Sequence, residues 1–446
     1  MFDACASWWT QGVGHGESSM SLAAAAAAGR YGHVIFPDVV HAPAVQLSQK
    51  LIDGPGSGWA SRVFFTDDGS TAMEVAIKMG MKLYQARHDI SDETRENVEW
   101  LVCAQQDCYH GDTLGVMDVA EPSIFNEKQH PWYEPKGIFL ATPTLGYHDG
   151  SLEISFSNNT LATFATVEEV MNVAGRLSSD LYLKYVNLIT EQWDSCEEDL
   201  AKRRIIGSVV MEPILMGAGG MKFVDPLWQR ALMDVAKVKK VPVIFDEVAS
   251  GFYRVGVQSC REILQSDPDI ASYAKLLTGG LVPLSVTLAT EEVFASFLSD
   301  EKGQALLHGH SYTAHPIGCV SAIHALETYE SVLNNQSKER LQLFNEEQTR
   351  SLSRLPLVKQ SFSLGTVLAV TIEPEDGAGG YGASSRTLPL VRELRRKGVY
   401  ARPLGNVIYI MASPLTNAAE CARLCDVLYQ TIAAYEEKII AARNSI

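Results

Sequence analysis

The chain of 446 residues lacks the hallmarks of several protein classes. It has no run of about eighteen apolar residues, so no membrane-spanning segment is predicted. Its eight cysteines form no CxxC pair, which argues against the common zinc patterns and favours reduced, mostly buried thiols. An excess of positive charge is also missing. The formal net charge is -16, which argues against nucleic acid and anionic membranes as main partners.

Motifs for other cofactors are missing as well. Neither GxxxxGK[ST] nor HExxH occurs, and the Gly-rich stretches at 12–16 and 54–58 lack GxGxxG spacing. The sequence therefore supports neither a P-loop, a zinc-protease nor an NAD site, and we predict no metal. The start has no signal or transit pattern and opens abruptly, so we expect a piece of a longer polypeptide. Together these features favour an intracellular enzyme, in the cytoplasm or the mitochondrial matrix.

The first three quarters of the chain alternate between strands and helices. Short apolar strands are predicted at 62–66, 101–104, 205–211 and 241–245, and amphipathic helices at 72–84 and 226–238. Near-continuous apolar strands between helices predict an α/β fold with a mostly parallel sheet covered by helices. Ligands of such sheets bind at the carboxyl ends of the strands.

The remaining segments complete the predicted outline. A helix is predicted over the alanine run 23–28, ending at Gly29, and residues 150–200 are expected to be polar and rich in helix. After a long helix at about 317–350, the sequence predicts strands at 365–371 and 406–411, a loop at 373–385, and helices at 387–397 and after 416. We predict an N-terminal segment (1–20), a large domain (21–330) and a small α+β domain (331–446).

Lys275 and Asp246 are the most informative pair of residues. Asp246 ends an apolar strand, where a carboxylate needs a cationic or donor partner. Lys275 is followed by two leucines and two glycines, which indicate burial and close backbone approach. A buried lysine has a lowered pKa, as an imine-forming amine requires. Such a lysine and an aspartate on the pyridinium nitrogen are the groups that pyridoxal phosphate needs. An ordinary salt bridge of Asp246 and a surface lysine remain the alternatives.

Other candidates follow neighbouring strands. Gly69 and Ser70 open a helix directly after a strand, which suits a phosphate, although a plain helix cap would look the same. Tyr109 follows the next strand and could stack on a cofactor ring or simply belong to the core. Arg402, before a proline, suits a substrate carboxylate, with an interdomain salt bridge as the alternative. Trp8 and Trp9 could wall an aliphatic pocket or pack in the core.

These residues lie in motifs that resemble the class III aminotransferases. The main motifs are DEVASGFYRVG at 246–256 and KLLTGG at 275–280. Further motifs resemble the members of that family that act in biotin synthesis: SWW at 7–9, YHGDT at 109–113, EP at 212–213 with GAGGM at 217–221, and RP at 402–403 with IY at 408–409. The resemblance covers nearly the whole chain. It implies the fold-type I architecture of pyridoxal phosphate enzymes and a homodimer with shared active sites.

The resemblance also implies a role for each site residue. Lys275 would carry the Schiff base and move the proton, with Asp246 on the pyridine nitrogen and Tyr109 on the ring. The cofactor would further contact Gly69, Ser70, His110, Glu212 and, from the neighbouring subunit, Ser311. The substrate would contact Trp8, Trp9, Asp112, Arg254, Gly309 and Arg402.

The implied reaction transfers an amino group to 7-keto-8-aminopelargonate, with S-adenosylmethionine as donor, in ping-pong order. An ω-aminotransferase for ornithine, γ-aminobutyrate or β-alanine, and a non-catalytic scaffold on the same fold, remain alternatives.

Three features depart from the family pattern. An N-terminal segment that adds a pocket tyrosine is missing, and His310-Ser311 replaces the usual Pro-Thr. The stretch at about 150–200 is longer than in compact bacterial relatives and resembles the eukaryotic form fused behind a dethiobiotin synthetase. We therefore expect a dethiobiotin synthetase domain upstream of this chain.

Overall fold

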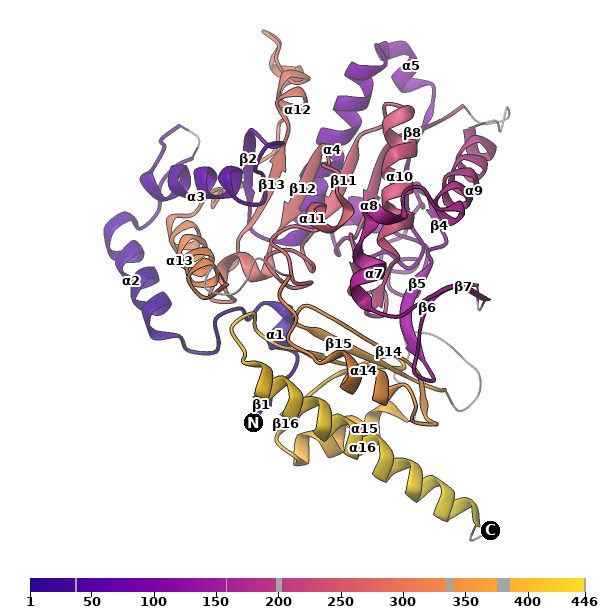
Figure 1. Cartoon of the computed structure of the whole chain (residues 1–446). Coiled ribbons are helices and arrows are strands. Elements are labelled where there is room, and N and C mark those ends of the chain that lie inside the picture. The colour runs from indigo at the N-terminus through magenta and orange to yellow at the C-terminus, as the bar shows by residue number, and fades with distance from the viewer. Residues whose placement is uncertain (37, 158, 198–202, 334–339, 375–385, 445–446) are drawn as a thin grey trace.

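The protein has two lobes, each built around a β-sheet (Figure 1). The computed structural model describes residues 1–36, 38–157, 159–197, 203–333, 340–374 and 386–444. The first lobe holds most of the chain up to α13, whereas the second holds the C-terminal helix α16 and both chain ends (Figure 1). Among the described residues, no helix is long and apolar enough to cross a bilayer.

Seven described strands form the sheet of the first lobe, in the order β2-β13-β12-β11-β8-β3-β4. Their bounds, in that order, are Arg62–Thr66, Ser285–Ala289, Ile270–Tyr273, Val243–Asp246, Arg204–Met211, Glu99–Gln105 and Gly137–Leu140. The strands from β12 to β4 are parallel to their neighbours, and β13 is antiparallel to both β12 and β2. This confirms the predicted α/β fold with a mostly parallel sheet.

Helices cover this sheet and complete the first lobe. The longest described one in contact with the sheet, α4 (Gly69–Arg87), packs against β8, β11, β12 and β13. The other elements of this part of the chain are α1 (Ala6–Trp9), α2 (Ser18–Tyr31), α3 (Ala42–Asp53), α5 (Asp92–Glu96), α6 (Leu114–Asp118), α7 (Val167–Met171), α8 (Val173–Arg176), α9 (Asp180–Glu197), β9 (Leu215–Met216), β10 (Lys222–Phe223), α10 (Pro226–Val238), α11 (Arg261–Leu264), η1 (Lys275–Thr278), α12 (Glu291–Ala295), η2 (Lys302–Gln304) and α13 (Pro316–Leu333).

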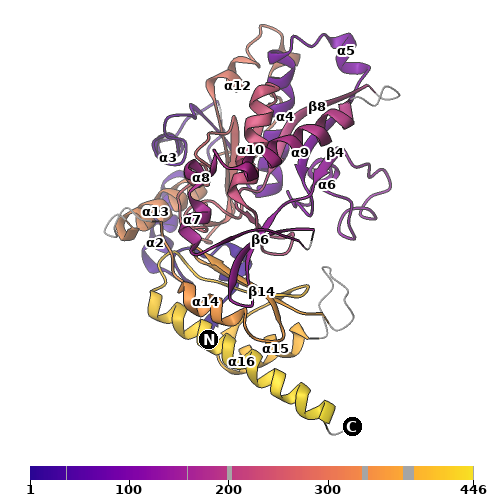
Figure 2. The same cartoon turned by 45° about the vertical axis from the view of Figure 1, so that its right-hand side comes forward.

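The sheet of the second lobe is antiparallel and draws on two distant parts of the chain. Its order is β17-β18-β15-β14-β5-β6-β7, with bounds Pro403–Leu404, Val407–Met411, Val367–Ile372, Val358–Leu364, Thr144–His148, Ser151–Phe156 and Asn159–Phe164. Helices α14 (Glu346–Leu352), α15 (Thr387–Arg396) and α16 (Ala418–Asn444) belong to this lobe, and β6 and β14 lie close to where the lobes meet (Figure 2). The sheet therefore crosses the boundary predicted at residue 331, and the three predicted domains stay a prediction.

The prediction for residues 150–200 was wrong in its first third. Residues 151–164 form the hairpin β6–β7, while α7, α8 and α9 follow as expected. The burial of β6 alternates, with Leu152 and Ile154 buried, but its other face is polar. Such a polar strand becomes stable only when it pairs with its neighbours, which local sequence does not show.

Two predicted helices have different bounds. The alanine-rich helix α2 runs through Gly29 and ends at Gly32, whose φ is +57°. A glycine inside a helix costs only about 1 kcal/mol, so it did not stop this one. The predicted helix 317–350 is instead α13 followed by α14, with residues 334–339 outside the described part. Most of the predicted loop at 373–385 also lies outside it.

The other predicted elements are confirmed. Strand β2 and helix α10 have the predicted bounds, and β3, β8, β11, β15, β18, α4, α15 and α16 match within a few residues. The N-terminal strand β1 (Phe2–Asp3) pairs with β16 (Val399–Tyr400), so the chain start belongs to the second lobe. All eight cysteines are free, and all but Cys196 are buried, as predicted.

Candidate functional site

The strand ends of the first sheet meet at one edge and line two adjoining cavities of about 1800 and 430 Å³. Asp246 is the last residue of β11, and Lys275 follows β12, its parallel neighbour, by two residues. The ends of β8, β3 and β2 add Glu212, the Tyr109–Gly111 loop and the start of α4. Lys275 and Tyr109 line both cavities, so the larger one opens onto the smaller. The structure thus brings the predicted lysine and aspartate together.

Lys275 has the properties of a reactive amine. Its backbone is in the left-handed region, with φ +48°, which is strained for a lysine and typical of functional sites. Its Nζ lies 5.2 Å from the ring centroid of Trp9 and has no hydrogen-bond partner among the described residues. Burial lowers the pKa of Lys275, although Asp246 and Glu212 oppose this effect. The lowered pKa increases the neutral, nucleophilic fraction of the amine.

Asp246 is buried and paired with a histidine. Its Oδ2 lies 2.8 Å from Nδ1 of His110, and its Oδ1 accepts a hydrogen bond from the backbone N–H of Val248. Burial disfavours the charged imidazole, but Cys108 and Asp246 outweigh it, so the pKa of His110 is well above 6.5. Nε2 of His110 is buried and has no partner in the described part of the chain.

Glu212 holds the loops around this pair. Its two carboxylate oxygens accept hydrogen bonds from the backbone N–H groups of Tyr109 and Gly217, at 2.9 and 3.0 Å. Its own backbone N–H donates to Gln105, and its carbonyl accepts from Gln229. Burial, with Asp246 nearby, raises the pKa of Glu212 to about 7. Glu212 therefore fixes the loop that carries Tyr109.

The start of α4 lines the smaller cavity together with the lysine. Asp68 caps the helix by accepting from the N–H of Thr71, and Gly69 and Ser70, the first two residues of α4, line this cavity. A side chain at position 69 would come within 2.7 Å of Val248, so glycine is required there. The free N–H groups and the helix dipole of this 19-residue helix attract a phosphate. The donor set thus fits pyridoxal phosphate: an amine, an opposing carboxylate and an anion cup around one cavity.

The larger cavity has an aromatic and cationic wall, in which Trp9 lies beside the lysine. Trp9 is 8% exposed, and its Nε1 donates to the hydroxyl of Tyr409 at 3.1 Å. Trp8 is 63% exposed, and the guanidinium of Arg402 lies 4.3 Å from its ring centroid. Tyr409 was not among the predicted site residues. Its place on the inward face of β18 depends on the sheet register, which strand periodicity alone does not supply.

Arg254 does not line either cavity. It is fully buried behind Trp9 and donates to the carbonyl oxygens of Trp9 and Ala412 and to the hydroxyl of Thr366. Burial lowers the pKa of Arg254 to about 10. In this chain Arg254 therefore positions the Trp9 backbone, and its predicted contact with substrate stays a prediction.

The remaining predicted residues lie at different distances from the lysine. Asp112 lines the larger cavity, and its backbone N–H donates to the Ser70 hydroxyl at 3.1 Å. Gly309 and Ser311 are exposed and line neither cavity. This exposure is compatible with the predicted contact to a neighbouring subunit, which stays a prediction.

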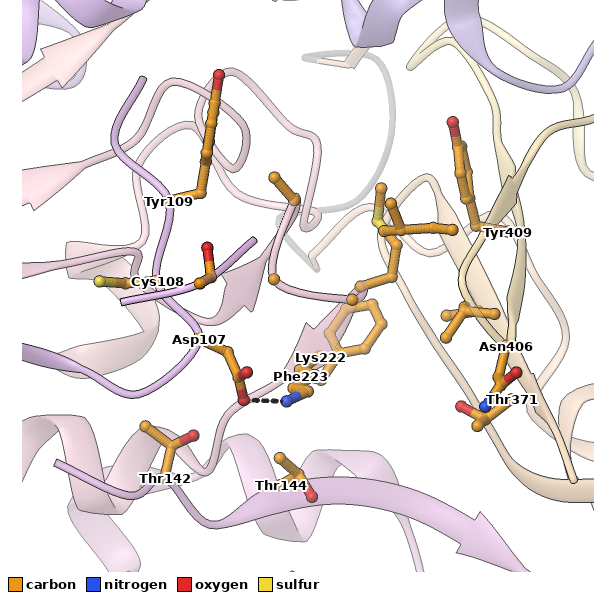
Figure 3. Close-up of a pocket in the computed structure, with 18 of the residues that line it drawn as sticks. Asp107, Cys108, Tyr109, Thr142, Thr144, Lys222, Phe223, Thr371, Asn406 and Tyr409 are labelled. Atoms are coloured by element: carbon orange, nitrogen blue, oxygen red, sulfur yellow. Dashed lines mark hydrogen bonds and ion pairs between the residues drawn. The ribbon is translucent and has the colours of Figure 1, made fainter. Parts of the chain in front are cut away.

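Figure 3 shows part of the larger cavity, including Tyr109. Asp107 and Lys222 form an ion pair on one side, near Thr142 and Thr144. Thr371 of β15, Tyr409 of β18 and Asn406, which precedes β18, lie across from the ion pair. The cavity therefore extends from the lysine into the space between the two lobes.

Comparison with known proteins gives consistent matches. The family model described as aminotransferase class-III matches residues 1–432. A rice protein named bifunctional dethiobiotin synthetase/7,8-diamino-pelargonic acid aminotransferase, mitochondrial, is 42% identical over 95% of this chain and 54% of its own length. The adenosylmethionine-8-amino-7-oxononanoate aminotransferase of Synechococcus elongatus is 32% identical over 92% of this chain and 85% of its own length.

The solved structures agree with these matches. The crystal structure of the enzyme of the same name from Methanocaldococcus jannaschii is 28% identical, with a TM-score of 0.76 over 96% of this chain and 88% of that one. This likeness confirms the predicted fold. The chain spans about half the length of the bifunctional plant relatives it matches.

Proposed function

Since this chain belongs to the class III aminotransferases, which depend on pyridoxal phosphate, we propose that it transfers an amino group to 7-keto-8-aminopelargonate and so forms 7,8-diaminopelargonate. The proposed donor is S-adenosylmethionine, and both half-reactions use the same site in turn. The names of the relatives support this acceptor and donor.

One observation in the cavity carries the proposal. Arg402 is the only arginine among the described residues that line the larger cavity, and it lies beside the indole ring of Trp8. Trp9 and Tyr409 make the wall near Lys275 aromatic. Such a site suits an acceptor with an apolar chain and a single terminal carboxylate. A dicarboxylate such as glutamate, the partner of many ω-aminotransferases, would need a second cation, and of the lining lysines besides Lys275, Lys222 is paired with Asp107 and Lys359 shares the cavity with Glu121, Glu153 and Glu373.

The residues around Lys275 have distinct roles in the proposed transfer. Pyridoxal phosphate, when bound, supplies an electron sink for the carbon that carries the amino group. Lys275 would hold the cofactor and move a proton at that carbon. Asp246, which pairs with His110, would pair with the pyridine nitrogen. Gly69, Ser70 and Tyr109 line the smaller cavity, where the backbone of the first two would hold the phosphate and Tyr109 the ring.

The proposal includes a homodimer with shared active sites. Four exposed apolar or aromatic side chains could be buried in such an interface: Ile35, Val40, Leu307 and Tyr312. Tyr312 neighbours Ser311, which would reach the phosphate of the other subunit. Sedimentation of the purified protein should give twice the chain mass, whereas a monomer that retains full activity would contradict the shared site.

The proposal also treats the chain as the aminotransferase part of a bifunctional enzyme. The rice and Arabidopsis thaliana relatives are fused to a dethiobiotin synthetase, and their names place them in mitochondria. This supports an upstream domain of that kind and a location in the mitochondrial matrix rather than the cytoplasm.

A direct assay tests the function. The cofactor-loaded protein is given 7-keto-8-aminopelargonate with S-adenosylmethionine, ornithine or glutamate as donor, and 7,8-diaminopelargonate is measured. We expect turnover with S-adenosylmethionine and at least about tenfold less with the other two. Efficient transfer from ornithine or glutamate would identify an ω-aminotransferase, and no transfer from any donor would favour the scaffold.

A further inference from the structure

The larger cavity exceeds what the proposed acceptor fills. Its volume is about 1800 Å³, whereas small-molecule pockets are typically ~300–1,000 Å³. It begins at Lys275 and Arg402 and continues along the second sheet to β7. An unbranched keto acid that ends at Arg402 leaves this outer part empty. The outer part therefore has room for a second, larger molecule that uses the same lysine.

One face of the second sheet forms the wall of this outer part. Tyr409 lies opposite Ala369, and Ala369 lies opposite Phe362. The register continues from β14 to β5, where Gly146 lies opposite Glu153 of β6. Opposed residues of antiparallel strands share a face. The wall thus extends from Tyr409 to Glu153, about 19 Å by four inter-strand spacings.

The chemistry of the wall changes along this distance. On β18, β15 and β14 one cross-strand row is apolar or aromatic, with Tyr409, Ala369 and Phe362. On β5, β6 and β7 the lining side chains are mostly polar, with Thr144, Glu153, Ser155 and Thr160. An aliphatic chain gains nothing from this outer part, whereas a molecule with several hydroxyl and ring-nitrogen groups can bond to it.

Two groups in the wall have spare hydrogen-bonding capacity. Glu153 Oε2 accepts from the hydroxyl of Thr160 at 2.7 Å, while Oε1 has no partner among the described residues. The His148 ring bonds to the Lys359 carbonyl through Nδ1, but its buried Nε2 has no partner in that same part of the chain. Buried polar atoms are normally satisfied, so Nε2 of His148 points to a polar ligand, and the half-buried Oε1 of Glu153 is free to accept a hydrogen bond from it.

The charges of the outer part favour a cation over an anion. Lys222 is paired with Asp107 (Figure 3). Of the other charged lining residues in this part, Glu121, Glu153 and Glu373 are acidic and Lys359 is basic. A net negative wall attracts a positively charged ligand such as a sulfonium and repels a dicarboxylate.

The acceptor and the donor must extend different groups from Lys275 into the outer part of the cavity. Both put the reacting amino or keto carbon at Lys275. The acceptor then extends outward to its carboxylate, which Arg402 holds. In S-adenosylmethionine the carboxylate lies next to the reacting amine, so the group that extends outward is the sulfonium and the adenosine. The donor therefore requires the part of the cavity that the acceptor leaves empty.

We infer that the outer wall formed by β5, β6 and β7 is a subsite for the ribonucleoside part of the amino donor, in which Glu153 accepts hydrogen bonds from the ribose hydroxyls. Carboxylates recurrently bind ribose in this way. This inference rests on the proposed function and adds the residues that distinguish donor from acceptor at a shared lysine.

The experiment compares the two half-reactions. Glu153→Gln removes the charge and keeps the shape, and Asp149→Asn in the exposed turn of the same hairpin is the matched control. In the cofactor-loaded enzyme we expect Glu153→Gln to raise KM for S-adenosylmethionine about tenfold or more, because a hydrogen bond to a charged group is lost. KM for the keto acid, and both constants of Asp149→Asn, should remain within about twofold. A Glu153→Gln enzyme with unchanged donor KM, or with both KM values raised equally, contradicts the subsite.

A binding measurement keeps the inference testable if the variant folds poorly. 5′-Deoxy-5′-methylthioadenosine carries the nucleoside without the amino acid, and calorimetry should detect its binding to the unmodified loaded enzyme, in competition with S-adenosylmethionine. No binding at concentrations that saturate the donor would overturn the subsite while leaving the proposed function intact. Absence of amino transfer from S-adenosylmethionine would overturn the proposed function and the subsite together.

Discussion

The cavity has two walls that differ in construction. The inner wall lies at the strand ends of the parallel sheet, where Asp246, Glu212 and His110 are at most 4% exposed and hydrogen-bonded to neighbouring groups. The outer wall is one face of the antiparallel sheet, and its polar side chains, such as Glu153 and Thr160, are partly or fully exposed.

The two walls should therefore respond differently to substitution. Breaking a buried ion pair leaves an uncompensated charge at a cost of about 3–5 kcal/mol, whereas an exposed pair contributes only ~0–1 kcal/mol. The inner wall therefore tolerates little change without loss of catalysis or folding. We expect substitutions in the outer wall to change which molecule binds while the protein stays folded. The following experiments test this contrast, from the largest expected effect to the smallest.

Replacing Lys275 with alanine should have the largest effect. The variant loses both the covalent hold on pyridoxal phosphate and the group that moves the proton, so amino transfer should fall by about 10⁴-fold or more. Initial rates and the visible absorbance of the lysine-bound cofactor measure the loss. The exposed Lys184 of α9 offers a control, and Lys184→Ala should keep both signals. Residual activity of Lys275→Ala near that of the control would remove the basis of the proposed function.

The raised pKa of Glu212 predicts a pH-dependent stability of the cofactor-free protein. Between its ordinary pKa of 4.5 and the folded value of about 7, the folded protein keeps a proton that the unfolded chain releases. Stability from this group is therefore fully present below pH 4.5 and lost as pH rises to 7, by about 3 kcal/mol at ~1.4 kcal/mol per pKa unit.

Glu212→Gln isolates this effect, because glutamine does not titrate. The variant should be less stable at low pH, since its amide N–H cannot replace the acceptor for Tyr109 and Gly217. The difference in unfolding free energy from the unmodified protein, measured in urea, should shrink as pH rises from 4.5 to 7. A constant difference over that range would mean that Glu212 is ionised throughout.

Arg402→Met tests whether Arg402 binds the carboxylate of the acceptor but not that of the donor. Loss of a charge-assisted bond to the acceptor carboxylate, worth about 1.5–3 kcal/mol, should raise KM for the keto acid about 10- to 100-fold. KM for S-adenosylmethionine should change much less, because its carboxylate lies near Lys275. Arg396→Met, with a side chain that is 77% exposed, serves as the control. Equal changes for both substrates would show that Arg402 acts on the cavity as a whole.

Tyr147→Phe should give the smallest effect. Tyr147 on β5 donates to Glu346 of α14 at 2.5 Å and so joins the hairpin to the C-terminal part of the second lobe. Its loss should cost about 1–2 kcal/mol of stability, seen as a lower midpoint in thermal unfolding. Kinetic constants should stay unchanged, because Tyr147 faces away from the cavity. A large loss of activity at unchanged stability would show that this contact sets the cavity shape.

The residues of the inner wall were predictable from sequence, whereas those of the outer wall were not. Asp246 and Glu212 follow predicted apolar strands, and parallel strands bring their carboxyl ends together without further information. Lys275 was predicted from its leucine and glycine neighbours, since strand β12 before it was not predicted. The hairpin β6–β7 alternates weakly and owes its place to β5 and, through Tyr147 and Ser361, to β14, more than two hundred residues away in sequence. The sequence alone therefore did not predict that Glu153 of this hairpin lines the cavity.

Arg254 shows the same limit within a recognised motif. The family resemblance predicted a substrate contact, which stays a prediction, and the structure places its guanidinium behind Trp9, outside both cavities. Side-chain direction in a turn depends on backbone conformation, and the preceding Phe252 and Tyr253 have positive φ values. Local sequence does not determine such a conformation, because the surrounding core holds it in place.

The order of residues along this chain suffices to predict a mostly parallel sheet, an aspartate at one of its strand ends, a buried lysine, and a helix that starts at Gly69 directly after a strand. These features follow from local periodicity and from the geometry that all parallel sheets share. Which side chains form the second wall, how far the cavity extends past Arg402, and which way Arg254 points were settled only when distant strands paired. Strand pairing joins segments far apart in sequence, so its register carries information that no single segment contains.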